Sequence, residues 1–216
     1  MAAVLRVANV GRGMRFVLAG VATLVLASAG VVGGLLWPTN DPETRAAEQD
    51  AFDRPPDCAL LDEETLDAVV PDARVEQDTR GPVTGGQQAT CAWSTAVSAT
   101  NSQEEQEEQE ELRALTVEFE VQFTQADTAD GAQLAANRLA TDLPEAPFPE
   151  AAQALGPDAR AQPGTGGSGR EVAFVRDNLV VWVWYGGTQD STTAEIPGSD
   201  AHEAAHTVAE QLAERL

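Results

Sequence analysis

Residues 115–124 constrain the fold more than any other part of the chain, because apolar and polar side chains alternate there without interruption. The apolar positions are Leu115, Val117, Phe119, Val121 and Phe123. Successive side chains of a strand point to opposite faces, so a period of two predicts a strand with one buried and one solvated face. Such a strand is typical of an antiparallel sheet that is covered on one side.

Two neighbouring segments, residues 172–175 and 179–185, predict a β-hairpin, since both are rich in β-branched and aromatic residues. Asp177 and Asn178 lie between them and supply a two-residue turn, because both residue types tolerate positive φ. A shorter strand is predicted at residues 90–95. These segments indicate a sheet built largely from antiparallel neighbours.

Trp182 and Trp184 share one face of the second hairpin strand, whereas Val181, Val183 and Tyr185 share the other. Two interpretations of the aromatic pair stay open. The commoner one is core packing beneath a helix, since large aromatic side chains dominate the energetics of cores. The alternative is a platform on which a ligand stacks.

Helices are predicted at residues 62–70, 130–143 and 199–216, with Asp62 and Ser199 as N-caps. The last of these helices carries an apolar stripe of Ala201, Ala205, Val208, Leu212 and Leu216. We therefore expect an α+β domain in which an antiparallel sheet of four or five strands packs against two or three helices.

An uncharged run of 21 residues, 16–36, precedes this domain. A helix of that length spans ~30 Å, the thickness of the hydrocarbon core of a bilayer. Three arginines and no acid precede the run, so the positive-inside rule predicts a cytoplasmic stub at residues 1–15 and a transmembrane signal anchor at 16–37. The alternative is a signal peptide cleaved near Ala29, followed by secretion. Either interpretation places the remainder outside the cytoplasm.

The charge is distributed unevenly along the chain. Residues 1–37 carry a formal charge of +3, whereas residues 38–216 hold ten Arg against 35 acids, a charge of −25. This excess of acid excludes nucleic acid as a partner bound through a general basic surface. Residues 38–57, rich in proline and acid, predict a flexible linker, so the extracytoplasmic domain is expected at 58–216.

Cys58 and Cys91 are the two cysteines of the chain. Outside the cytoplasm two cysteines in one domain usually pair, so we predict a disulfide that closes a loop of about 34 residues. Such a bridge contributes about 3–4 kcal/mol in the chain-entropy model. No C-x-x-C spacing lowers a thiol pKa, which argues against a redox role.

His202, Glu203 and His206 form an H-E-x-x-H motif on the predicted last helix. Two imidazoles one turn apart can bind one Zn²⁺, with Glu203 as general base for a metal-bound water, and the motif resembles the zinc metalloprotease signature. However, the chain has no third His, and Ala209 and Leu212 stand where an extended motif has Gly and His. The alternative is that both histidines flank an amphipathic stripe, and we predict no catalytic residue, metal or cofactor.

The folded part also resembles an actinobacterial family of exported lipoproteins and membrane-anchored proteins of unknown function, over residues 57–216. The motifs that carry the resemblance are Asp57-Cys58-Ala59-Leu60-Leu61, Cys91-Ala92-Trp93, Leu155-Gly156-Pro157-Asp158-Ala159, the strand at 180–184 and the closing Arg215-Leu216. The resemblance implies a disulfide, a small α+β domain and residence in the cell envelope, with no established chemistry. The chain lacks a lipid-attachment cysteine, so anchoring is expected through residues 16–37.

We therefore expect a single-pass membrane protein whose partners are the lipid bilayer, through residues 16–37, and an unknown envelope ligand or protein. A non-enzymatic binding or interaction module is the leading hypothesis. The alternatives are a zinc-dependent hydrolase that uses His202, Glu203 and His206, and a passive structural protein of the envelope.

Overall fold

The structure is a computed structural model, which describes residues 45–95, 112–125, 129–144, 152–164, 169–189 and 194–216. Residues 42–216 form one compact unit with its own hydrophobic core, so this part is expected to fold independently. The predicted anchor at residues 16–37 lies outside the described residues. Across the described ranges, no helix is both long and apolar enough to cross a bilayer.

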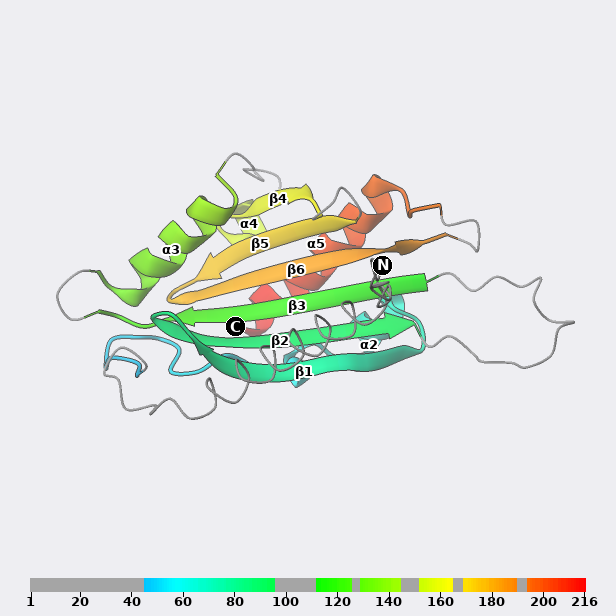
Figure 1. Cartoon of the computed structure of the whole chain (residues 1–216). Coiled ribbons are helices and arrows are strands. Elements are labelled where there is room, and N and C mark those ends of the chain that lie inside the picture. The colour runs from blue at the N-terminus through cyan, green and yellow to red at the C-terminus, as the bar shows by residue number, and fades with distance from the viewer. Residues whose placement is uncertain (1–44, 96–111, 126–128, 145–151, 165–168, 190–193) are drawn as a thin grey trace, which may run out of the picture. The chain divides into compact units, whose positions relative to one another are not determined.

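A single antiparallel sheet of six strands forms the centre of the domain (Figure 1). Its strands lie in the order β1-β2-β3-β6-β5-β4. Their bounds are β1 Ala73–Val83, β2 Gly86–Thr95, β3 Leu112–Gln122, β4 Arg160–Pro163, β5 Arg170–Arg176 and β6 Leu179–Thr188. The predicted antiparallel sheet is thus confirmed, although it has six strands rather than four or five.

The strand that the sequence patterns missed most clearly is β1. It is exposed along almost its whole length, and only its end residues Ala73 and Val83 are partly buried. Because β1 lies at the edge of the sheet and carries charged side chains, it shows no apolar alternation. The other missed strand, β4, lies at the opposite edge and has four residues.

Helices occur in all three predicted regions. The helical elements are η2 Cys58–Leu60, α2 Glu63–Val69, α3 Gly131–Asp142, α4 Ala152–Leu155 and α5 Gly198–Arg215. Asp62 caps α2 as predicted, because its carboxylate accepts a hydrogen bond from the Thr65 backbone N–H at 2.6 Å. The predicted cap of α5 is wrong, since Pro197 is the N-cap and Ser199 lies inside the helix.

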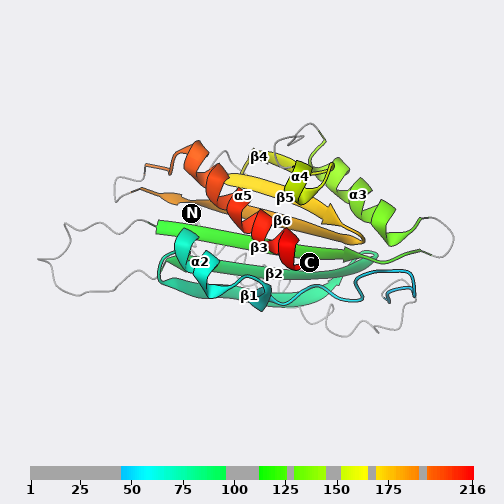
Figure 2. The same cartoon turned by 180° about the vertical axis from the view of Figure 1, so that it is seen from behind.

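Both faces of the sheet are covered in part, by different helices. Helix α5 lies behind the sheet in Figure 1 and in front of it in Figure 2, where it packs on β5 and β6. Helix α3 packs on the other face of β3, β5 and β6 and forms a second small core with Ala173 and Val180. The expectation of a sheet covered on one side is therefore wrong.

The alternation in β3 separates these two faces. Leu115, Val117, Phe119 and Val121 are all at most 1% exposed and belong to the main core beneath α5. On the opposite face Thr116 and Glu118 are half-buried, as a partly covered face requires. Glu120 and Gln122 are 5% and 7% exposed, because α3 lies over this end of the strand. The period of two is confirmed, but the polar face is buried at the end of β3 that lies beneath α3.

Residues 45–57 are joined to the folded domain, although they fall within the predicted linker. The Asp50 carboxylate accepts hydrogen bonds from the Thr124 backbone N–H at 3.0 Å and from the Thr124 hydroxyl at 2.6 Å. Asn178, 1% exposed, accepts from the Phe52 N–H at 2.9 Å and donates to the carbonyls of Phe52 and Gln122. These hydrogen bonds attach residues 45–57 to the end of the sheet that lies next to the turn between β5 and β6.

Replacing Asn178 by Ala is expected to lower the free energy of unfolding by about 2–4 kcal/mol, because buried backbone groups of Phe52 and Gln122 lose their partners. The measurement is urea denaturation of residues 42–216. Asp177→Asn is the matched control, since Asp177 is exposed and has φ 51°, which Asn also tolerates. Equal stability of both variants would show that the buried amide is not needed.

Candidate functional site

The predicted disulfide is present. Cys58 and Cys91 are bonded, and they join the short helix η2 to the centre of β2. Cys91 is fully buried, so the bridge lies against the main core rather than at a reactive surface. Its position supports a structural role, because the bridge links η2 covalently to the sheet.

The two histidines of the H-E-x-x-H motif lie side by side on α5. The ring centroids of His202 and His206 are 6.3 Å apart, and the rings are nearly parallel, with an interplanar angle of 11°. His206 Nε2 is also 3.5 Å from Glu210 Oε1, one turn further along the helix. Within the described residues, no group of three His, Cys, Asp or Glu side chains is arranged to hold a metal ion. The hydrolase hypothesis therefore lacks a third ligand in this part of the chain.

Trp182 and Trp184 lie on the face of the sheet opposite α5. In the register of β3 and β6, Trp182 lies opposite Glu118. On the other side of β6, Trp184 lies opposite Glu171 of β5. Both tryptophans are half-buried, and Trp182 packs beside the α3 core. We call the surface of these four side chains the Trp–Glu face.

The ring of Trp184 leans along its own strand. A Cβ atom added at Gly186 would stand 2.8 Å from Cζ2 of the ring, so the ring lies over the bare backbone of that glycine. The absence of a side chain at Gly186 therefore leaves room for the Trp184 ring over the backbone.

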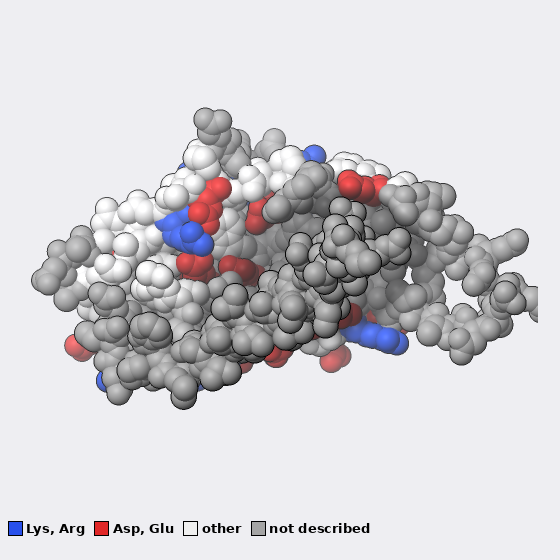
Figure 3. Space-filling view, in the orientation of Figure 1, with Lys and Arg blue, Asp and Glu red and all other residues white. Residues whose placement is uncertain are grey.

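One carboxylate beside this face is fully engaged. Glu120 has a side chain that is 7% exposed, and its carboxylate lies 3.1 Å from Nε of Arg138 on α3. Gln122 Nε2 donates to the same oxygen at 2.6 Å, and Arg138 also pairs with Asp142. Figure 3 shows a basic patch with acidic groups around it on the face of the domain that carries α3.

Glu118 is a second acid of this face. Burial raises the pKa of its carboxyl group and the neighbouring charge of Glu120 raises the pKa further, against the lowering effect of a side-chain hydrogen bond with Gln88 and of the Arg138 charge. Glu118 also lines a hollow of about 460 Å³ together with Gln88, Glu120 and Arg138. Glu171 adds to the repulsion, although Gln162 Nε2 donates to one of its oxygens at 2.8 Å. A cation placed between Glu118 and Glu171 would relieve this repulsion.

Sequence patterns identified the tryptophans of this face but not its acids. The alternation predicts Glu118 on the solvated side of its strand; Glu118 lies on that side but is half-buried, and its neighbour across the sheet depends on β3 lying next to β6. That pairing joins segments about 65 residues apart in sequence, and no local pattern reports it. Arg138 was assigned only to a helix, because nothing in its sequence shows that α3 lies over the sheet.

Comparison of the chain with protein-family models, with curated proteins and with solved structures gives no match. The family resemblance of residues 57–216 therefore remains an expectation. Any functional argument for this chain depends on the site geometry alone.

We expect no stoichiometric zinc in residues 42–216 after chelation, zinc re-addition and dialysis, because two imidazoles alone do not complete a tetrahedral site. Metal content per chain is the measurement, with His202→Ala as the matched variant. One zinc per wild-type chain that is lost in His202→Ala would restore the hydrolase hypothesis.

Glu118→Gln is expected to raise the free energy of unfolding at pH 7, by up to about 0.5 kcal/mol given solvent screening. The raised pKa means that folding disfavours the ionised carboxylate, so the gain is present above that pKa. It disappears as the pH falls below the ordinary value of a glutamate, where both states are protonated. Thermal unfolding against pH tests this, with the exposed Glu195→Gln as control; a loss of stability at pH 7 would contradict it.

Proposed function

We propose that this chain is a membrane-anchored, non-enzymatic binding module on the outer side of the cell membrane, and that the Trp–Glu face binds its ligand. The observation that carries this proposal is the placement of Trp182 and Trp184 beside Glu118 and Glu171, on the sheet face that α5 leaves uncovered. Two half-buried tryptophans beside two carboxylates, of which Glu118 has a raised pKa, favour a ligand site over a purely structural role.

The chemistry of this face favours an organic cation as the ligand class. An ammonium group over an indole ring is attracted by the ring quadrupole, by about 0.5–1 kcal/mol at exposed sites and more where water is excluded. The carboxylates of Glu118 and Glu171 add a direct charge interaction. The formal charge of −25 on residues 38–216 raises the local concentration of any cation near the domain.

The location of this module follows from the predicted anchor. Residues 16–37 hold the chain in the bilayer in this proposal, and the cation ligand is a component of the envelope or its surroundings. The disulfide supports an oxidising compartment, since such bonds are rare in the cytoplasm.

Choline and its uncharged carbon isostere, 3,3-dimethylbutan-1-ol, provide the most direct test of this proposal. We expect choline to bind residues 42–216 with millimolar affinity, measured by calorimetry, and the neutral isostere to bind at least about fivefold more weakly. Binding of choline should also weaken as the pH falls through the raised pKa of Glu118, because the carboxylate becomes neutral.

Trp184→Leu keeps an apolar side chain over Gly186 and is expected to weaken choline binding about fivefold, since the π face is lost. Val75→Ser, an exposed position on the opposite face of the sheet, is the matched control and should change nothing. Equal binding of choline and its isostere, or unchanged binding in Trp184→Leu, would contradict the proposal. Binding of methyl glucoside in place of choline would show that the ligand class is wrong.

A further inference from the structure

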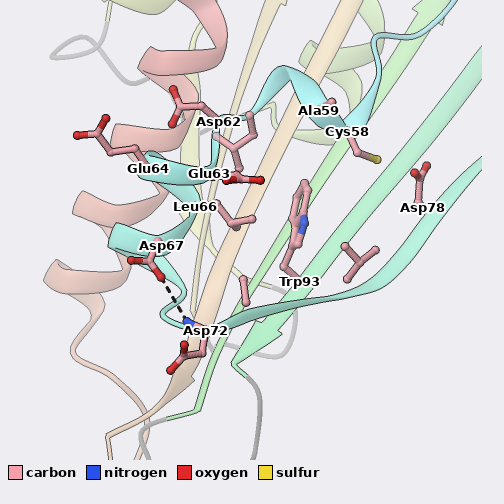
Figure 4. Close-up of a pocket in the computed structure, with 13 residues that line it drawn as sticks. Cys58, Ala59, Asp62, Glu63, Glu64, Leu66, Asp67, Asp72, Asp78 and Trp93 are labelled. Atoms are coloured by element: carbon pink, nitrogen blue, oxygen red, sulfur yellow. Dashed lines mark hydrogen bonds between the residues drawn. The ribbon is translucent and has the colours of Figure 1, made fainter.

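The face of the sheet beneath α5 is wider than the helix layer that covers it. Helix α5 packs on β5 and β6, and η2 packs on β2. Among the described elements β1 pairs with β2 alone, and its outer edge carries no further strand. A groove of about 940 Å³ therefore opens between α2 and β1 (Figure 4). We call it the α2–β1 groove.

Apolar side chains form the floor of this groove. Trp93, at 6% exposure, stands at its centre, with Leu66 of α2 on one side. Val75 of β1, which lies opposite Trp93 in the pairing of β1 and β2, is 66% exposed. An apolar side chain from a partner would bury Val75 and complete the cover over Trp93.

The rim of the groove is acidic. Among the described residues, six carboxylates line it and no arginine does. Asp62 is engaged by Arg215 and Gln211, and Asp67 accepts a hydrogen bond from the backbone of Asp72. Glu63 and Asp78 are exposed and lie on opposite sides of Trp93, Glu63 on α2 and Asp78 on β1 (Figure 4). An occupant thus meets negative charge on each side of an apolar centre.

We propose that the α2–β1 groove docks an extended basic peptide segment of a partner protein, with an apolar side chain over Trp93 and cationic side chains facing Glu63 and Asp78. Charge complementarity selects this occupant. A second copy of this chain is disfavoured, because two acidic grooves on chains of net charge −22 repel each other. A divalent cation is disfavoured too, since the described carboxylates form no group suited to hold one.

This inference does not depend on the Trp–Glu face. The side chains of Val75 and Trp93 point to the face that carries the main core, whereas Trp182 and Trp184 point to the other. The two proposals can therefore fail separately.

The probe is a short peptide of alternating lysine and leucine, titrated into residues 42–216 by calorimetry at low and high salt. We expect this peptide to bind, and a lysine–serine peptide of equal charge to bind at least about tenfold more weakly, because it brings no apolar anchor. Binding should weaken with added salt, since exposed charges are screened.

Val75→Ser is expected to weaken binding of the lysine–leucine peptide about fivefold, since an apolar contact is lost. Its matched control is Leu112→Ser, which removes the other large apolar side chain that is exposed among the described residues, on the opposite face. Both positions are exposed, so neither change is expected to unfold the domain.

The double change Glu63→Gln with Asp78→Asn should weaken binding about tenfold at low salt. Its charge-matched control is Asp158→Asn with Glu195→Gln, two exposed acids away from the groove. Trp184→Leu should leave peptide binding unchanged.

Three results would overturn the proposal. The first is equal binding of both peptides, which would indicate attraction to general acidic charge. The second is unchanged binding in Val75→Ser, or its loss in Trp184→Leu, which would place the peptide elsewhere. The third is a dimer of the wild-type domain in sedimentation that Val75→Ser abolishes, which would identify a second copy as the occupant.

Discussion

The pairing of β3 with β6 is the interaction on which the rest of the domain depends. Val117 lies opposite Val183 in this pair, and the next positions along bring Glu118 opposite Trp182. A register shift of one residue would move every side chain of the strand to the opposite face of the sheet. Because the apolar side chains must be buried under α5, the polar side chains and the tryptophans are placed on the other face. The main core and the Trp–Glu face are therefore consequences of one register.

The periphery of the sheet is held by polar and covalent links rather than by a larger core. Asn178 and Asp50 attach residues 45–57 to the hairpin end of the sheet. The Tyr185 hydroxyl donates to the Val69 carbonyl at 2.6 Å and fixes the end of α2 against β6. With the disulfide these links position α2 beside β1 without covering that strand, which leaves the α2–β1 groove open.

Patterns of one-sided burial predicted β3 and the helices α2, α3 and α5, whereas composition and a two-residue turn predicted the β5–β6 hairpin. The edge strand β1 was not predicted, because both of its faces are exposed to solvent. Residues 45–57 have the composition of a linker, and only the partners of Asp50 and Phe52 in space reveal that they are docked. The acids of the Trp–Glu face were visible in sequence, but their assembly depends on strand order, which is a long-range property.

The proposed function requires a cation to contact Trp182 and Trp184 on the sheet face opposite α5, and the indole N–H signals of residues 42–216 test this most directly. Trp93, Trp182 and Trp184 each contribute one such signal in a ¹H–¹⁵N spectrum. On addition of choline, the account predicts that the signals of Trp182 and Trp184 move while that of Trp93 stays in place. If the signals of Trp182 and Trp184 do not move, or if the signal of Trp93 moves as far as theirs, the proposed binding of a cation by Trp182 and Trp184 is contradicted.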